Sequence, residues 1–557
     1  MKRIHEATGF AAKKLCSGRA KKAVIICVLL IQAALIVFWA GQRSNYYIDE
    51  LFSFGSAHAY ALPKENAVYI TSSEKWQYEE WIENSVLKEE LEITSKESLL
   101  NRPPLRAIRL ILTGRNYHGI LNVLMSAFSP GKVSAYPAAV LNLILFLFTQ
   151  LVLYRTMKRL TGSISISLLT ILMYGFSAMA ISTVLYVRFY MLVTLLLLAL
   201  VCIHQIMWQE ERLLRCELLT VLGMALIYLA MKDSELVFIL AGSLVTAYAV
   251  ALIIGRQFKK AVLYIVTVFP VSIAYAVIKT NFFDIVLHPS NYVMGDGAEA
   301  WMTDKLLTVN KERLISLVFK YLGWVSDLLF GSWYVLCCFL VLILILLEVW
   351  LFGKKRHSRL QAVPEGRRRG FIWVIAAVCA VYYVFSLLVA IPAERYFMYY
   401  FPLLVILLWK LLHELTRGLR YRREVLLVCC ALVCIGAAAL QIVRPEKIDF
   451  VYREDRPLIR TVQDSGIQSV IVIYTGERDS NHSAYDCLNL MPDTARLYPI
   501  DRYRHHIDAS ECPDKLLIWI HGDRQPEPYI TDLLDEGFVL QQLGQTHASD
   551  VYLAQRT

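Results

Sequence analysis

Residues 23–41 read AVIICVLLIQAALIVFWAG and contain no charged side chain. An apolar helix of about 20 residues is long enough to cross the hydrocarbon core of a bilayer, which is ~30 Å thick. A basic N-terminus precedes the run, as it does in a secretory signal peptide. The run is long for a signal peptide, however, and no small-residue cleavage site follows it. The stretch therefore predicts a first transmembrane helix whose N-terminus lies in the cytoplasm.

Apolar runs of similar length recur along the chain as far as residue 443. They cover about 135–153, 164–184, 189–207, 217–231, 235–254, 261–280, 332–352, 371–391, 397–412 and 424–443. Hydrophobic residues make up 57% of the chain and charged residues only 19%, so these runs cannot all be buried in a soluble core. We predict a polytopic α-helical membrane protein with about eleven transmembrane helices, which occupy residues 1–443.

The charges of the connecting loops predict the orientation of these helices. Alternate loops carry most of the basic side chains, among them Arg155, Lys158, Arg212, Arg215, Lys259, Lys260, Lys354, Lys355, Arg420 and Arg423. The short loops between them hold little more than Arg188, Lys232 and Arg395. Because Lys and Arg are enriched in cytoplasmic loops, we expect the N-terminus inside and the C-terminal residues outside the cell membrane. The net charge of +10 is then explained by these loops, and no nucleic-acid partner is expected.

Two long polar regions lie outside the apolar runs. Residues 42–133 are predicted to form a large extracytoplasmic loop, in which amphipathic stretches near 50–60 and 117–129 lie along the membrane surface. Residues 444–557 are predicted to form a soluble extracytoplasmic domain. Its expected elements are strands at Val470–Tyr474 and Leu516–Ile520 and helices at 456–465, 482–491 and 528–536. Strands that alternate with helices indicate a small α/β domain.

The cysteines of the chain indicate no structural metal. Most of them lie in apolar runs, where a cysteine behaves as a small hydrophobic residue. The sequence has no pair of cysteines with the spacing of zinc ligands. Cys487 and Cys512 lie in the C-terminal region, and they could form a disulfide if that region faces an oxidising compartment.

Asp49 and Glu50 follow closely on the first apolar run, in the segment Asn45-Tyr46-Tyr47-Ile48-Asp49-Glu50. A carboxylate at this position could act as a general base toward a hydroxyl group. The pair could also hold a divalent cation, although no third ligand with a fixed spacing is evident. The alternative is that two acidic residues simply lie on a solvated outer loop.

Arg188 and Arg395 each stand in a short outer turn between apolar runs. An arginine near lipid is costly unless it has a partner or a task. Guanidinium groups bind phosphate with two parallel hydrogen bonds, so these arginines are candidates for holding a lipid-linked phosphate. The alternative is that lipid headgroups alone surround both side chains.

Two further places could contribute to a substrate cavity. Lys232, Asp233 and Glu235 fill the outer turn after the run at 217–231, where they could equally form a solvated hairpin tip. His118 begins the second amphipathic stretch, and a single histidine of this kind is more often structural than functional.

In combination these segments resemble the GT-C superfamily of membrane glycosyltransferases, and more closely its bacterial members related to protein O-mannosyltransferases and aminoarabinose transferases. The resemblance is carried by Asp49-Glu50, Leu160-Thr161-Gly162, Tyr174-Gly175-Phe176-Ser177, Arg188-Phe189-Tyr190-Met191-Leu192, Glu394-Arg395-Tyr396 and Phe401-Pro402. Each motif is short, and the specificity lies in their order and spacing over most of residues 23–443. The α/β region also resembles the extracytoplasmic domain of several such proteins.

The resemblance implies roles for individual residues. Asp49 would be the catalytic base and Glu50 its neighbour, while Arg188 and Arg395, with Tyr190 and Tyr396 beside them, would bind the phosphate of the donor. Two segments depart from the family pattern. Asn116-Tyr117-His118-Gly119-Ile120-Leu121 replaces a run like His-Pro-Pro-Leu-Tyr-Tyr, and Met231-Lys232-Asp233-Ser234-Glu235 replaces Thr-His-Tyr. Both departures suggest an altered substrate or a loss of activity.

We therefore expect an inverting glycosyltransferase that moves a sugar from a polyprenyl-phosphate-linked donor to an acceptor outside a bacterial plasma membrane. The acceptor could be a glycan, a lipid or a protein. One alternative is a transporter or flippase for lipid-linked sugars, which would more typically show paired halves or broken helices at mid-membrane. A second alternative is a catalytically inactive relative that acts as a scaffold.

Overall fold

The computed structural model describes residues 18–62, 80–234, 236–278, 310–353, 366–389, 391, 393–416, 419, 421–474, 491–500, 507–521, 530–547 and 549–557. They form two compact units, and each unit is assembled from separate parts of the chain. The helical unit comprises the described residues of Met1–Ile36, Leu143–Val184 and Tyr190–Ile448. The sheet unit comprises those of Val37–Asn142, Leu185–Phe189 and Asp449–Thr557.

Each of the predicted apolar runs overlaps a helix of the described residues. Eight helices in the described residues are long and apolar enough to cross a membrane, namely α2 (Gly18–Gln42), α7 (Tyr136–Thr161), α10 (Tyr190–Gln209), α11 (Leu213–Asp233), α12 (Val237–Ile254), α18 (Trp333–Gly353), α19 (Gly366–Leu388) and α21 (Arg422–Ile442). A ninth span results if α8 (Ile164–Gly175) and α9 (Ala178–Leu185), which meet at a 57° bend, cross together. The last two runs lie on α13 (Phe258–Ile278) and α20 (Phe401–Thr416). The prediction of a polytopic helical membrane protein is confirmed.

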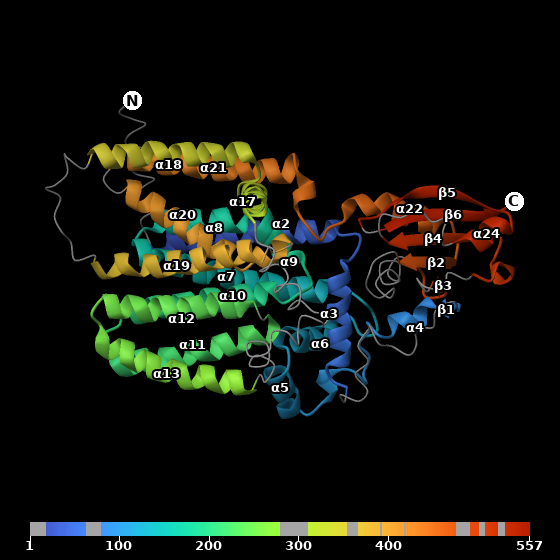
Figure 1. The fold of residues 1–557 in the computed structure, drawn as a ribbon, viewed down its shortest axis with the longest axis horizontal. Coiled ribbons are helices and arrows are strands. Elements are labelled where there is room, and N and C mark those ends of the chain that lie inside the picture. The colour runs from blue at the N-terminus through green and yellow to red at the C-terminus, as the bar shows by residue number, and fades with distance from the viewer. Residues whose placement is uncertain are drawn as a thin grey trace. The chain divides into compact units, whose positions relative to one another are not determined.

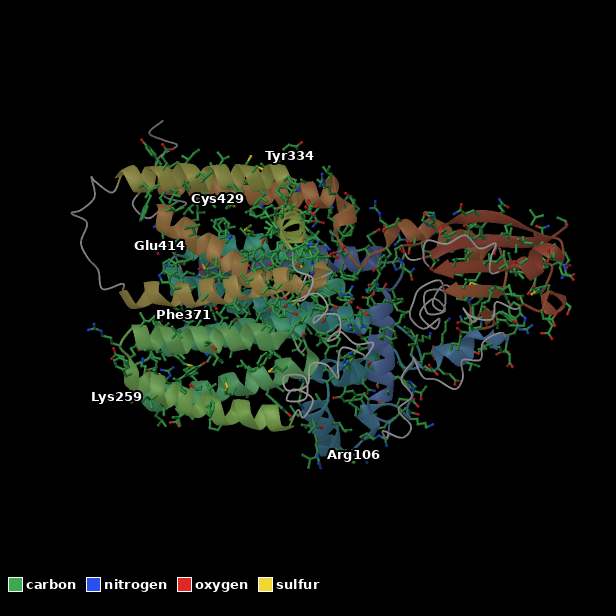
Figure 2. All side chains as sticks on the ribbon, viewed as in Figure 1. Arg106, Lys259, Tyr334, Phe371, Glu414 and Cys429 are labelled. Atoms are coloured by element: carbon green, nitrogen blue, oxygen red, sulfur yellow. The ribbon has the colours of Figure 1, made fainter. Side chains whose placement is uncertain are left out.

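The helical unit exposes apolar side chains and buries polar ones. In Figure 1, α10, α11, α12, α13 and α19 run side by side with nearly parallel axes. Tyr334 on α18 points away from the helices and is 83% exposed, whereas Phe371 on α19 is buried (Figure 2). Inside the unit, His204 forms hydrogen bonds with Leu200 O and with the hydroxyl of Tyr264 at 2.7 Å. Polar groups in a bilayer must be satisfied within the protein, and this arrangement is typical of a membrane bundle.

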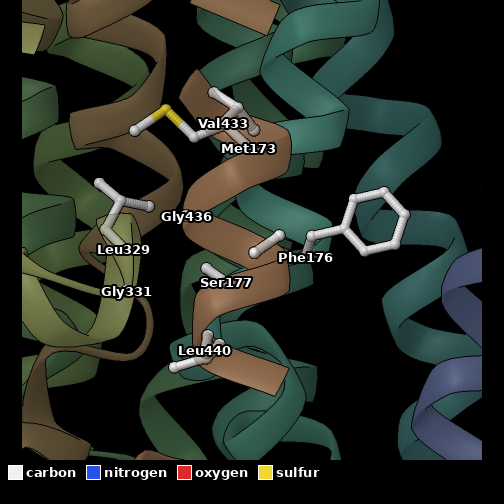
Figure 3. Close-up of a pocket in the computed structure, with 9 residues that line it drawn as sticks. Met173, Phe176, Ser177, Leu329, Gly331, Val433, Gly436 and Leu440 are labelled. Carbon is white, nitrogen blue, oxygen red and sulfur yellow. The ribbon is translucent and has the colours of Figure 1, made fainter. Parts of the chain in front are cut away.

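Two glycines bring the start of α18 close to α21. A Cβ atom added to Gly436 would overlap the main-chain oxygen of Phe330, and one added to Gly331 would overlap that of Gly436. Gly331 also has a left-handed backbone with φ of 78°, which favours glycine. A small pocket of about 10 Å³ lies beside this contact, lined in part by Met173 and Ser177 near the bend between α8 and α9 (Figure 3).

Replacing Gly436 with alanine should therefore destabilise the helical unit, because the backbone of α21 and the segment before α18 have to separate. Overpacking of this kind costs about 1–3 kcal/mol. A lower thermal unfolding midpoint in detergent would show the effect, with Gly242→Ala on α12 as the control, since nothing lies within 4 Å of a Cβ atom there. Equal unfolding midpoints for the two variants would contradict the prediction.

The sheet unit contains a six-stranded sheet in the order β1-β3-β2-β4-β6-β5 (Figure 1). The strands are β1 (Ile82–Glu83), β2 (Ser469–Tyr474), β3 (Arg496–Pro499), β4 (Lys515–His521), β5 (Phe538–Gln545) and β6 (Ser549–Arg556). β2 runs parallel to β3 and β4, and the other neighbouring pairs are antiparallel. The helices α22 (Arg456–Asp464) and α24 (Thr531–Asp535) complete the small α/β fold, which confirms the prediction.

The predicted strands are the two central ones, β2 and β4, whose apolar residues are almost fully buried. β5 and β6 were missed because polar residues interrupt them. The helix predicted at 482–491 and Cys487 lie outside the described residues, except for Met491, which is not in a helix.

The first polar loop contributes to the same unit. The α-helices among its described residues are α3 (Ile48–Ala59), α4 (Asn84–Lys88), α5 (Pro104–Thr113) and α6 (Asn116–Phe128). α3 and α6 correspond to the two predicted amphipathic stretches, and they pack against each other. β1 comes from this loop and pairs with β3, so the sheet combines segments that are distant in sequence. The limits predicted for the two domains, 1–443 and 444–557, stay predictions.

Candidate functional site

The turn that follows α2 presents both candidate carboxylates at the start of α3. Tyr47 is the residue before the first helical turn, and Asp49 and Glu50 lie within that turn. The side chain of Glu50 folds back and accepts a hydrogen bond from Tyr47 N at 2.8 Å. Acidic residues are favoured here because they satisfy unpaired N–H groups and the positive end of the helix dipole.

Glu50 is fully buried and holds three segments together. Its Oε2 forms an ion pair with Arg43 and accepts the bond from Tyr47 N, while its Oε1 accepts a hydrogen bond from Val187 N at 2.8 Å. Burial alone would lower the pKa of Arg43, but the charge and the hydrogen bond of Glu50, together with the neighbouring hydroxyls of Tyr46 and Tyr452, outweigh this effect and raise the pKa. The arrangement therefore fits a structural role for Glu50.

Truncating Glu50 to alanine should strongly destabilise the sheet unit. It leaves the Arg43 guanidinium buried without its counter-charge, and breaking such a pair on one side costs about 3–5 kcal/mol. Unfolding in denaturant would measure the loss. Glu536→Ala, which removes an exposed carboxylate after α24, is the matched control and should change stability little. Stability equal to that of the control would contradict the structural role.

Asp49 differs from Glu50 because it is only partly buried. Its Oδ2 accepts a hydrogen bond from the hydroxyl of Tyr186 at 2.8 Å. Its main-chain oxygen accepts bonds from Ser53 Oγ at 3.2 Å and from Arg188 Nη1 at 3.0 Å. Of the two adjacent carboxylates, Asp49 is therefore the one that can meet a substrate.

Arg188 is positioned by the turn that also binds Glu50. Arg188 N donates to Tyr186 O at 2.7 Å, and the neighbouring Val187 N bonds to Glu50. Nη1 of Arg188 lies 3.5 Å from Ser53 Oγ, and the guanidinium carbon lies 5.4 Å from the centre of the Phe189 ring. The structure thus brings Arg188 and Asp49, which are distant in sequence, into one cluster.

His118 lies on α6 and is fully buried. Among the described residues neither ring nitrogen has a hydrogen-bond partner. Burial, followed by the positive charges of Arg188 and Arg115, lowers the pKa of His118 well below its usual value. The imidazole is accordingly neutral at pH 7, and it lies near enough to Arg188 for that positive charge to disfavour its protonation.

This environment predicts a pH-dependent loss of stability. The unfolded chain binds a proton at His118 below about pH 6.5, whereas the folded protein resists it, so stability falls as the pH drops below that value. We expect wild-type protein to lose about 1.4 kcal/mol more than His118→Phe between about pH 7.5 and pH 5.5. Unfolding curves at the two pH values provide the test. The same loss in both proteins would show that His118 is protonated in the folded state.

The remaining candidates belong to the helical unit. Arg395 lies on η5 (Glu394–Phe397) with its guanidinium carbon 5.2 Å from the centre of the Tyr396 ring. Tyr190 stacks on Tyr399, with ring centres 6.2 Å apart. Lys232 lies over the Tyr228 ring at 4.5 Å, and Asp233 is buried at the end of α11. Glu235 lies outside the described residues. The roles predicted for these residues stay predictions.

Arg43 and Tyr186 contact the candidate carboxylates but were not among the predicted site residues. Arg43 also borders a cavity of about 120 Å³, which is lined in part by Ser44, Tyr46 and Tyr136. One signal could have identified Arg43. It directly follows the first apolar run, at the end that the loop charges predict to be extracytoplasmic, and an arginine at such a place usually has an acidic partner.

The described residues contain no group of three or more His, Cys, Asp or Glu side chains that could hold a metal ion. Asp49 and Glu50 point to different partners, namely Tyr186 for the first and Arg43 with Val187 for the second. A divalent cation at this pair would therefore need ligands from a substrate or from solvent.

No protein-family model matches the chain, and no curated protein sequence matches it. Two solved structures similar to it are crystal structures of ArnT from Cupriavidus metallidurans. The one bound to undecaprenyl phosphate aligns over 96% of this chain and 98% of its own, with 11% sequence identity and a TM-score of 0.49. The apo state aligns over 95% and 98%, with 13% identity and a TM-score of 0.41. At these values the likeness is distant, and it assigns no activity or ligand to this chain.

Proposed function

We propose that the chain is a GT-C-type glycosyltransferase that moves a sugar from a polyprenyl-phosphate donor to a hydroxyl acceptor. The observation that carries the proposal is the contact between Arg188 and Asp49, with Arg188 Nη1 3.0 Å from the main-chain oxygen of Asp49. A partly exposed carboxylate and a neighbouring guanidinium group meet the two needs of this reaction. One group accepts a proton and the other binds a departing phosphate.

In the proposed reaction Asp49 takes the proton of the acceptor hydroxyl. The acceptor oxygen attacks the anomeric carbon from the face opposite the phosphate, so the configuration inverts. The bond between the anomeric carbon and the phosphate oxygen breaks, and its electron pair stays on the polyprenyl phosphate. Arg188 stabilises the negative charge that develops on this phosphate. A preorganised hydrogen-bond donor of this kind lowers the activation free energy by about 2.7–4 kcal/mol.

Glu50 and Arg43 act in this proposal by holding the site together. The buried ion pair and the bond from Val187 N to Glu50 fix the start of α3 against the turn at 186–188. That turn carries both Arg188 and Tyr186, whose hydroxyl bonds to Asp49. Asp49 thus keeps a defined orientation while its side chain remains partly open to solvent.

The polyprenyl chain of the donor would remain in the bilayer, as expected for a multi-pass membrane protein. The distribution of basic residues among the loops supports a reaction on the extracytoplasmic face. A flippase for lipid-linked sugars could use Arg188, but it would have no need for a proton acceptor beside it. An inactive scaffold would retain the donor without consuming it.

A transfer assay tests the proposal. Purified protein in nanodiscs receives a mixed pool of polyprenyl-phosphate sugars with a radiolabelled sugar, together with glycan, glycolipid and peptide acceptors. We expect labelled sugar to appear on one acceptor class, with release of an equal amount of polyprenyl phosphate. Retention of the donor without release would indicate a scaffold, and movement of intact donor across vesicles would indicate a flippase. Either result would contradict the transferase.

A further inference from the structure

Residues 449–455, here called the strap, follow the last transmembrane helix and run past the candidate site within the sheet unit. The ring of Phe450 lies flat on the ring of Tyr186, with centres 3.9 Å apart and planes 6° apart. The ring of Tyr47 meets Phe450 edge-on at 5.9 Å. The ring of Phe450 therefore covers one face of Tyr186, whose hydroxyl donates a hydrogen bond to Asp49.

The backbone of the strap adopts conformations that aromatic residues rarely take. Phe450 has φ of 66° and Tyr452 has φ of 51°, and both values lie in the left-handed region. A side chain with a Cβ atom is strained there and remains only when surrounding contacts impose the conformation. Both residues have such contacts, because Phe450 stacks on Tyr186 and Tyr452 stacks on His547 with ring centres 3.7 Å apart.

Hydrogen bonds attach the strap to the turn after α2. Ser44 N donates to Val451 O at 3.0 Å, and the Ser44 hydroxyl donates to Tyr452 O. Asn45 Nδ2 donates to Asp455 Oδ2 at 2.9 Å. The strap thus contacts the segment that leads directly into Asp49 and Glu50.

A second set of bonds attaches the strap to the sheet. Asp455 is fully buried and accepts a hydrogen bond from His547 N at 2.9 Å, and its Oδ2 lies 2.7 Å from His547 Nδ1. His547 stands in the turn between β5 and β6. One carboxylate therefore joins the C-terminal hairpin to the turn that carries the candidate site.

We propose that Phe450 is a positioning residue, which fixes the ring of Tyr186 so that its hydroxyl holds Asp49 in the orientation for proton transfer. The inference rests on the proposed function, since the role of Asp49 as base is part of that proposal. A stacked aromatic partner restricts the tyrosine ring to one orientation. A displacement of a reacting group by about 1 Å can cost 10²-fold in rate. The C-terminal domain would then be part of the catalytic machinery.

The kinetic test compares Phe450→Leu, Tyr186→Phe and the double variant, with Phe450→Tyr as the conservative replacement. We expect kcat to fall by about 10- to 100-fold in each single variant, with the KM for donor changed less than about twofold. The double variant should be no slower than Tyr186→Phe, because both changes disturb the same series of contacts, from Phe450 through Tyr186 to Asp49. Phe450→Tyr should restore most of the rate, and Phe128→Leu, at an exposed site on α6, is the control.

A second readout does not require activity. A water-soluble carbodiimide with an amine labels carboxyl groups, and mass spectrometry gives the rate at Asp49. The rate should rise several-fold in both Phe450→Leu and Tyr186→Phe, because each weakens or removes the hydrogen bond that Asp49 Oδ2 accepts from Tyr186. It should stay at the wild-type level in Phe450→Tyr and Phe128→Leu.

The outcomes separate the inference from the function on which it rests. If wild-type protein transfers no sugar but labelling of Asp49 changes as expected, the proposed function is wrong. The effect of Phe450 on Asp49 through Tyr186 is then still supported. If wild-type protein is active while Phe450→Leu keeps its full kcat and its wild-type labelling rate, the inference is wrong. Losses that multiply in the double variant would likewise overturn it, since independent effects would then be at work.

Discussion

Replacing Asp49 with asparagine should reduce the rate of sugar transfer by about 10²- to 10⁴-fold, which is the contribution of a general base. The substitution keeps the size of the side chain and removes its ability to accept a proton. The hydroxyl of Tyr186 can still donate to an amide oxygen in the place of Oδ2. Arg188 bonds to the main-chain oxygen of residue 49, so its position does not depend on the carboxylate.

Donor binding should therefore survive in Asp49→Asn while the chemical step fails. Single-turnover measurement with preloaded donor separates the two, because the amount of bound donor and its rate of consumption are recorded together. Asp464→Asn, which changes an exposed carboxylate at the end of α22, serves as the matched control. Transfer at the control rate would exclude Asp49 as the base, even if the protein proved to be a transferase.

Replacing Arg188 with alanine should have the second large effect, with a loss of about 10²- to 10³-fold in kcat and weaker binding of the donor. The guanidinium group places a positive charge directly beside the main chain of Asp49, the proposed base. Removing it leaves the departing phosphate without its proposed hydrogen-bond donor and without the neighbouring positive charge. Arg188→Lys should recover only part of the rate, because an ammonium group offers a point charge without the planar pair of donors.

The measurement for Arg188 combines kcat with retention of polyprenyl phosphate, which competes with the donor. Arg106→Ala on the exposed surface of α5 is the control for a general loss of positive charge (Figure 2). Unchanged retention and unchanged kcat in Arg188→Ala would place the phosphate at another group. A loss of retention in both variants would instead indicate non-specific attraction to the basic surface.

The helices of the fold could be predicted because the length and the apolar character of each run can be read from the local sequence alone. The run at 23–41 needs no knowledge of the rest of the chain to be recognised as a membrane helix. Residues 82–83 show the opposite case. Their pairing with β3 joins positions more than four hundred residues apart, and a two-residue strand has no sequence pattern of its own.

Asp49, Glu50 and Arg188 could be named as candidates from the sequence, whereas Arg43 was missed and the different roles of the two carboxylates could not be predicted. Asp49 and Glu50 are adjacent and chemically alike, so the sequence cannot tell which of them faces a substrate. The difference arises from Arg43 and Val187, which occupy the carboxylate of Glu50. Phe450 could not be found at all, because stacking on a tyrosine over 260 residues away leaves no local signal.

In the proposed reaction, the start of α3 and the turn at 186–188 form one site for a lipid-linked phosphate and its sugar. A cryo-electron microscopy structure of the protein in nanodiscs with a non-hydrolysable polyprenyl-phosphonate sugar tests it directly. We expect a phosphonate oxygen within about 3 Å of the Arg188 guanidinium, with the carboxylate of Asp49 on the opposite side of the anomeric carbon. A phosphonate group bound away from Arg188, with Asp49 facing no part of the sugar, would contradict it.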